Sequence, residues 1–156
     1  FDPARATPRL FAPIPASVLE LIVVWLWHVP AFHYAARHHQ TALVLEQATF
    51  LAAGLFLWLA AAAGDSRQST ARAAAGIGGL LFTSIHMTLL GALFALAPRL
   101  LYDHAASDVA GASALDDQHL GGAIMLLVGG VSYLAGGLWL AARLVRTPSL
   151  GHEATS

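Results

Sequence analysis

Residues 73–97 read AAAGIGGLLFTSIHMTLLGALFALA, a run without Asp, Glu, Lys or Arg. About 20 apolar residues in a helix cross the roughly 30 Å hydrocarbon core of a bilayer, so this run can span one. Three further apolar runs lie at about 16–34, 40–63 and 119–142. The sequence therefore predicts an all-α integral membrane protein, a bundle of four transmembrane helices.

The composition agrees with a domain surrounded by a lipid bilayer. The 156-residue chain is 57% hydrophobic and 11% charged, which leaves too little polar surface to cover the core of a soluble fold. Its formal net charge of -1 gives no reason to expect nucleic acid as a partner. We expect an N-terminal segment at 1–15, a four-helix transmembrane domain at 16–145 and a C-terminal tail at 146–156.

The arginines predict the orientation of the bundle in the membrane. With four spans, six of the eight arginines lie on the side of the two termini, and only Arg37 and Arg99 lie on the other side. Cytoplasmic loops are enriched in basic residues, so we expect cytoplasmic termini. The 34–40 turn and the 98–118 loop are then outside.

Ionisable side chains inside apolar runs are expensive in a membrane and tend to mark function. His28 directly precedes Val29 and Pro30, where the missing amide N–H of proline ends or kinks a helix. Glu46 lies about two turns into the second run, and His86 lies near the middle of the third. We expect the His86 imidazole to face other helices, because it would lose its hydrogen bonds in lipid.

The fourth run carries a stripe of small residues. Gly122, Gly129 and Gly136 recur every seven residues, a spacing that lets helix backbones approach closely. Extending this stripe outward by one turn reaches His119 and then Asp116. The stripe therefore predicts that both side chains point into the bundle.

These residues form a set of candidate metal ligands. Because the chain has no cysteine, a bound metal must use imidazole, carboxylate or thioether groups. Copper suits such ligands, although zinc accepts the same histidine and aspartate set. Simpler roles stay open as well: an interfacial aromatic belt around His28, an interhelical hydrogen bond from His86, and a helix cap at Asp116 or Asp117. The candidate ligands are His28, Glu46, His86, Asp116, Asp117 and His119.

Four separated motifs resemble the CtaG-type cytochrome c oxidase assembly factors. They are Trp27–His28–Val29–Pro30, Leu45–Glu46 followed by FLAAGLFLW at 50–58, His86 with Leu90–Gly91, and Asp117–Gln118 with LGG at 120–122. The resemblance implies a multi-pass protein of the bacterial cytoplasmic membrane, haem-copper oxidase subunits as partners, and a role in supplying copper. The family usually has histidine where Leu43 and Gln47 stand. If those two positions are metal ligands in the family, this chain has lost part of the site, or His38, His39 and His119 replace it.

The leading hypothesis is an oxidase assembly factor that assists copper delivery or insertion at the outer membrane face. Two alternatives stay open: a non-catalytic accessory subunit of an oxidase, and an electron carrier holding haem b between His28 and His86. A homo-oligomer is also left open. We do not expect an enzyme, because the sequence contains no nucleophile with a nearby base, no phosphate loop and no metalloprotease spacing.

Overall fold

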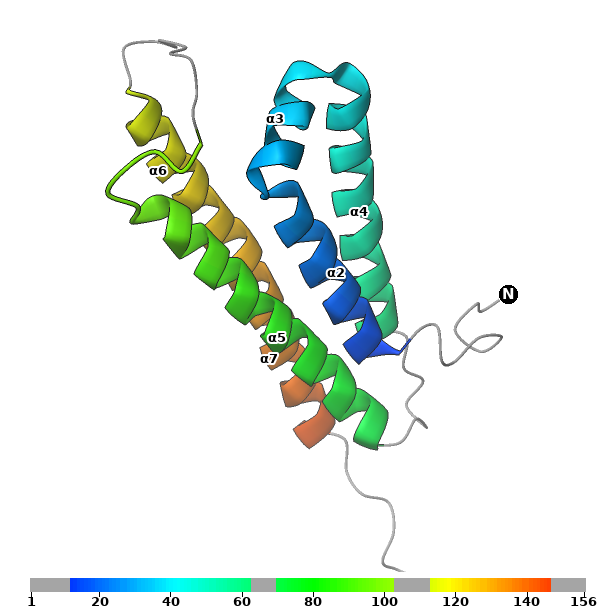
Figure 1. Ribbon diagram of the computed structural model, residues 1–156. Helices are drawn as coiled ribbons and strands as arrows, with labels where there is room; N and C mark the ends of the chain where they lie inside the picture. Colours follow the sequence, from blue (N-terminus) through cyan, green and yellow to red (C-terminus); the bar gives the residue numbers. More distant parts are fainter. Residues whose placement is uncertain (1–11, 63–69, 103–112, 147–156) are drawn as a thin grey trace, which may run out of the picture.

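The computed structural model describes residues 12–62, 70–102 and 113–146. In these ranges every regular element is a helix, which confirms the all-α prediction. Most of the predicted N-terminal segment and C-terminal tail, and much of the 98–118 loop, lie outside the described residues. The helices, in chain order (Figure 1), are α2 (Pro13–Trp27), α3 (Pro30–His38), α4 (Gln40–Ala62), α5 (Thr70–Ala95), α6 (Ala114–Met125), the π-helix η1 (Leu126–Gly130) and α7 (Val131–Arg146).

The number of membrane spans is three or four. By length and composition, α4, α5 and the continuous unit Ala114–Arg146 can each cross a membrane. The first predicted run, at 16–34, is not one straight helix, because α2 and α3 are bent by 70° relative to each other. They pass the same test together, so the bundle has a fourth span if the bent pair is one.

The bend follows from Pro30. Proline lacks an amide N–H and disfavours the helical conformation at the residue before it. Val29 is accordingly extended, with φ -68° and ψ 135°, and α3 starts anew at Pro30. With 15 residues, α2 is about 22 Å long, shorter than a hydrocarbon core.

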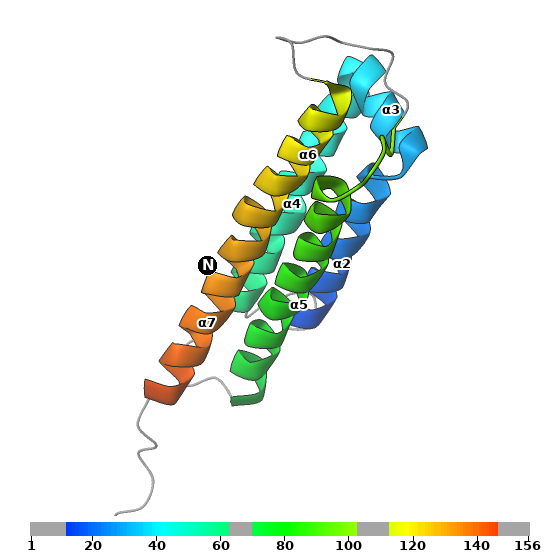
Figure 2. The ribbon, with the colours of Figure 1, turned by 90° about the vertical axis from the view of Figure 1, so that its left-hand side faces the viewer.

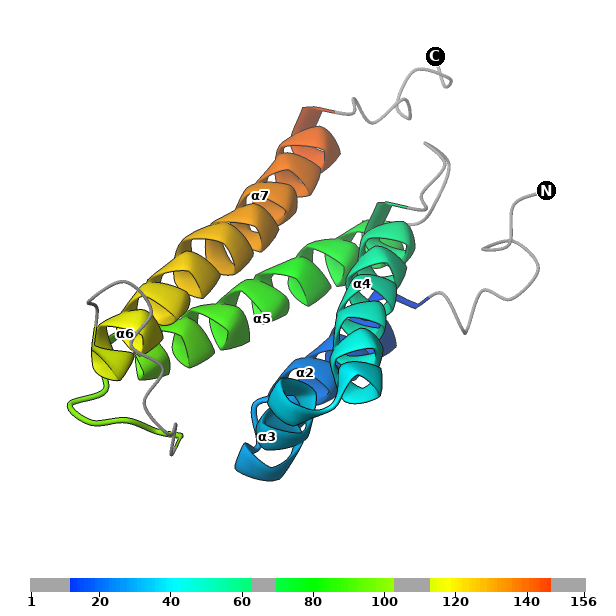
Figure 3. The same cartoon turned by 90° about the horizontal axis from the view of Figure 1, so that it is seen from above.

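The helix α5 lies at the centre of the bundle. It packs along α6, η1 and α7 on one side and along α2 and α4 on the other, an order that is visible from above (Figure 3). The bent helix α3 and the start of α6 lie at the same end of the bundle (Figures 1 and 2), which we call the α3 end. The end of α7 lies at the opposite end (Figure 1).

Glycines bring α5 and α6 into backbone contact. A Cβ added at Gly91 would lie 2.7 Å from the backbone nitrogen of Leu126. A Cβ added at Gly122 would lie 2.8 Å from the carbonyl oxygen of Gly91 and would also collide with the backbone nitrogen of Ala95. Real Cβ atoms do not make such contacts, so these two positions require glycine. The prediction of a packing stripe is confirmed at Gly122.

The remaining glycines of the stripe face side chains. A Cβ at Gly136 would collide with the indole ring of Trp58, and one at Gly129 would lie 2.5 Å from the Cε atom of Met87. The stripe therefore faces neighbouring helices at all three of its positions. Only at Gly122 is the obstacle the backbone of another helix, because indole and thioether groups are side chains that can move.

Two buried apolar clusters fill the bundle. One contains Ala16, Leu57, Ala60 and Leu80, and the other contains Val24, Leu90 and Phe94. On α2, Glu20 lies between Ala16 and Val24, and on α5 His86 lies between Leu80 and Leu90. Polar side chains thus occupy the core between the two apolar clusters.

Candidate functional site

A buried carboxylate and a buried imidazole meet at this position between the two clusters. Oε2 of Glu20, on α2, lies 3.0 Å from Nε2 of His86, on α5. Only 3% of Glu20 and 4% of His86 is exposed. The hydroxyl group of Tyr133, on α7, interacts with the same carboxylate. The prediction that His86 faces other helices is confirmed, and three helices contribute to its surroundings.

This polar group is incompletely satisfied by the protein. Among the described residues, no hydrogen-bond partner is found for Oε2 of Glu20, for either ring nitrogen of His86 or for the hydroxyl of Thr83. The 3.0 Å contact between Glu20 and His86 is therefore close without having the angles of a hydrogen bond. Buried polar atoms without partners are rare and point to a further group, such as a water molecule or an ion.

His28 lies at the α3 end, where α2 stops. Its Nδ1 atom is 2.7 Å from the carbonyl oxygen of Val24, in the preceding helical turn. A carbonyl oxygen only accepts, so the ring proton belongs on Nδ1, and Nε2 keeps the lone pair with which a neutral imidazole binds metals. The backbone carbonyl of His28 accepts a hydrogen bond from the Tyr102 hydroxyl at 2.6 Å.

Tyr102 connects three elements at this end. Its ring stacks on His33 of α3, with ring centroids 4.0 Å apart and planes 14° apart. Burial, and secondarily the negative charge of Glu46 on α4, raise the pKa of Tyr102 to about 12. The hydroxyl therefore keeps its proton near neutral pH and remains a donor to the backbone of His28. His28, His33 and Glu46 thus surround one tyrosine.

The remaining predicted metal ligands lie at the start of α6. Asp116 forms a capping box with Ser113: the Asp116 carboxylate accepts from the Ser113 amide and hydroxyl at 3.1 and 2.7 Å, and the Asp116 amide donates to the Ser113 hydroxyl. The prediction that Asp116 points into the bundle is wrong, because this local cap holds its side chain at the helix start. Asp117 is exposed.

His119 does point inward, as the stripe predicts. Its Nε2 atom lies 2.8 Å from the carbonyl oxygen of Ala97, just after α5, and the residue is half-buried. The neighbouring Gln118 accepts a hydrogen bond from the Leu101 amide at 2.8 Å. Through these contacts, the two side chains connect the segment after α5 to the start of α6.

The six predicted ligands occupy separate places. His28, Glu46, Asp116, Asp117 and His119 are at the α3 end, and His86 is in the interior. Among residues 12–62, 70–102 and 113–146, no three His, Asp or Glu side chains are close enough together to hold a metal ion.

Glu20 was not among the ligands predicted from the sequence. A signal was available, because Glu20 is a carboxylate inside the first apolar run, where an unpaired charge is costly.

The contact between Glu20 and His86 also bears on the alternative that His28 and His86 hold a haem. Glu20 precedes His28 by eight residues, or about 12 Å along α2. His86 faces Glu20, so a haem between His28 and His86 would require the imidazole of His86 to leave the carboxylate.

The chain resembles known proteins at the level of a family. No curated protein and no solved structure matches the chain. The family model described as cytochrome c oxidase caa3 assembly factor matches residues 3–147, which is nearly the whole chain. All four motifs that resemble the CtaG-type proteins fall inside this match. The chain therefore belongs to the family of cytochrome c oxidase caa3 assembly factors.

Proposed function

We propose that this protein assists the assembly of a haem-copper cytochrome c oxidase in the bacterial cytoplasmic membrane by handling copper transiently. Membership of the family supports the role in oxidase assembly. The copper role is supported by one observation above all, the contact of Glu20 with His86 in the apolar interior. Apolar residues of similar volume often stabilise a protein as well as a buried ionisable pair does, so stability alone gives little reason to keep one.

The donors at the α3 end suit a first contact with copper. His28 has Nε2 available for a metal, and Glu46 is half-buried near Tyr102. Imidazole is a common copper ligand, and a site with few protein ligands lets an acceptor displace them. To bind a metal, His119 would first have to give up its contact with the Ala97 carbonyl, and Asp116 its hydrogen bonds to Ser113. We therefore assign these two residues a secondary role, together with the exposed Asp117.

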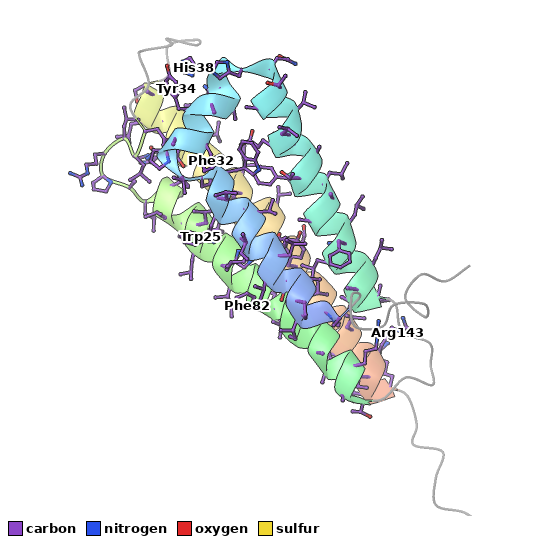
Figure 4. The ribbon with its side chains drawn as sticks, turned by 45° about the vertical axis from the view of Figure 1, so that its right-hand side comes forward. Trp25, Phe32, Tyr34, His38, Phe82 and Arg143 are labelled. Carbon is purple, nitrogen blue, oxygen red and sulfur yellow. The ribbon has the colours of Figure 1, made fainter. Side chains whose placement is uncertain are left out.

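The outer surface of the bundle suits lipid and a membrane partner. Large apolar side chains, including Trp25 and Phe82 (Figure 4), are about 40% exposed. On α4, Leu51 and Leu59 are exposed more fully, at 65% and 59%. Such surfaces are compatible with the hydrocarbon core and with the helices of an oxidase subunit.

The proposed function predicts transient association with an oxidase. We expect a tagged chain, cross-linked in membranes and purified, to capture oxidase subunits while oxidase is being synthesised. The yield should fall after synthesis of the oxidase is stopped, because an assembly factor leaves the finished enzyme. Stoichiometric recovery with mature, active oxidase would instead favour a permanent accessory subunit. An unrelated multi-pass protein carrying the same tag controls for capture caused by proximity alone.

The proposed orientation places the α3 end outside. Arg143 lies at the opposite end (Figure 4), 5.1 Å from the ring of Trp139, as expected for a cytoplasmic helix end. In intact spheroplasts, a membrane-impermeant maleimide should label His39→Cys, between α3 and α4, but should label Thr70→Cys, at the start of α5, only after lysis. Both positions are exposed, and the chain has no cysteine of its own. The reverse pattern would show that the bundle has the opposite orientation.

A further inference from the structure

We propose that Ser84 is a positioning residue, which acts through the π-helix η1 to bring the Tyr133 hydroxyl to the Glu20 carboxylate. This inference rests on the proposed function, in which the contact of Glu20 with His86 is the central observation. It adds two residues, Ser84 and Tyr133, and names the irregular stretch of backbone that directs Tyr133 towards α2.

The face that the unit α6–η1–α7 presents to α5 shifts by one residue at η1. An added Cβ would meet the α5 backbone at Gly122, would come within 3.8 Å of the Thr88 backbone at Gly130, and would come within 3.7 Å of the Ile77 backbone at Gly137. The last two glycines are seven residues apart, which returns a regular helix to nearly the same face. Gly122 and Gly130 are eight apart, and on a regular helix they would point about 80° away from each other. Both face α5, so one residue is absorbed between them.

The π-helix explains how this residue is absorbed. Its hydrogen bonds run from i to i+5, so a turn takes up one residue more than an α-helical turn does. In a regular helix of the same sequence, the extra residue would rotate α7 by about 100° relative to α6. π-Helices are rare and occur frequently at functional sites, so η1 indicates a role that a regular helix would not serve.

The register set by η1 determines where Tyr133 points. Tyr133 lies three residues after the end of η1. Its ring stacks on Trp58 of α4, with centroids 5.9 Å apart, and its hydroxyl interacts with the Glu20 carboxylate on α2. A rotation of α7 by about 100° would break both contacts. The carboxylate beside His86 therefore keeps its tyrosine partner only while η1 absorbs the extra residue.

Ser84, on α5, holds η1 in this form. Its hydroxyl donates to the carbonyl oxygen of Gly130, the last residue of η1, at 2.7 Å, and the bond is buried. A serine inside a helix often donates to a carbonyl one turn earlier, as Ser17 does to Ile14 on α2. Ser84 instead bonds another helix, which is how irregular backbone inside a membrane protein is commonly satisfied.

Deleting one residue from η1 tests the register. Val128 lies in η1 and is 64% exposed, so its deletion removes the extra residue without removing a buried side chain. The unit can then form a regular helix with Gly122 and Tyr133 in their present orientations, and we expect a folded protein in detergent. Deletion of Leu134 in α7, which is 42% exposed, is the matched control. It moves either Tyr133 or Gly137 out of place, so it should unfold at a clearly lower temperature.

Infrared spectroscopy of the Glu20 carboxyl group tests the role of Ser84. The band is identified by its loss in Glu20→Gln, and Tyr133→Phe should shift it by removing the hydroxyl. We expect Ser84→Ala to shift the band in the same direction as Tyr133→Phe, and deletion of Val128 to restore the wild-type band in Ser84→Ala. Ser17→Ala also removes a buried hydroxyl, at 1% exposure, and should leave the band unchanged.

Two results would overturn the positioning role. One is a wild-type Glu20 band in Ser84→Ala or in Tyr133→Phe. The other is a Val128 deletion that unfolds at the same temperature as the Leu134 deletion, a comparison that does not depend on how well Ser84→Ala folds. Neither measurement involves copper, so both results would leave the proposed function standing, which the copper content of the oxidase tests separately.

Discussion

Replacing Gly122 with alanine is expected to push α6 away from α5 and to lower the stability of the protein in detergent markedly. The added methyl group would meet the backbone of Gly91 and Ala95, which cannot rotate away as a side chain can. Overpacking of a tight contact typically costs about 1–3 kcal/mol, and an obstacle made of backbone places this variant at the upper end. Thermal unfolding followed by size-exclusion chromatography measures the effect.

The adjacent glycine supplies the control. A Cβ at Gly121 would meet nothing within 4 Å, and alanine has the better helix propensity by about 1 kcal/mol, so Gly121→Ala should be neutral or stabilising. Gly129→Ala should be intermediate, because the atom in its way is the flexible end of Met87. If Gly121→Ala and Gly122→Ala unfold at the same temperature, the close contact between α5 and α6 does not exist in the folded protein.

The sequence predicted the helices better than their mutual positions. The long apolar runs of α4 and α5 follow from hydropathy alone, because only a helix satisfies its own backbone in lipid. Pro30 similarly indicates where the first run is interrupted. The kink at Pro30 was therefore predictable, but its size of 70° was not, since it also depends on how α3 packs against α4 and how Tyr102 holds the backbone of His28.

The inward direction of His86 was predictable from the cost of exposing imidazole to lipid. Its partner was not, because the register between α2 and α5 decides which residues meet. Helices that are apolar on most faces leave that register undetermined in the sequence. The contact with Glu20 therefore had to come from the structure.

Asp116 illustrates how a local interaction can override a longer pattern. The glycine spacing pointed this side chain inward, but Ser113 followed three residues later by Asp116 is also the signature of a capping box. A cap satisfies amide groups at the first turn of α6, which otherwise have no partner. The capping box holds Asp116, whereas His119, one turn further along, follows the stripe and contacts Ala97.

If this chain supplies copper to an oxidase, the copper content of that oxidase should depend on the proposed copper-handling residues. Oxidase should be purified from cells producing wild-type chain, His28→Ala or His86→Gln, with copper measured per haem and the membrane abundance of each variant checked. His38→Ala with His39→Ala is the control, because both residues are exposed at the α3 end. We predict oxidase that keeps its haem but loses most of its active-site copper in the His28 and His86 variants, with partial recovery when copper is added to the medium. Normal copper per haem in both variants, at normal abundance, would show that neither His28 nor His86 helps to supply copper to the oxidase.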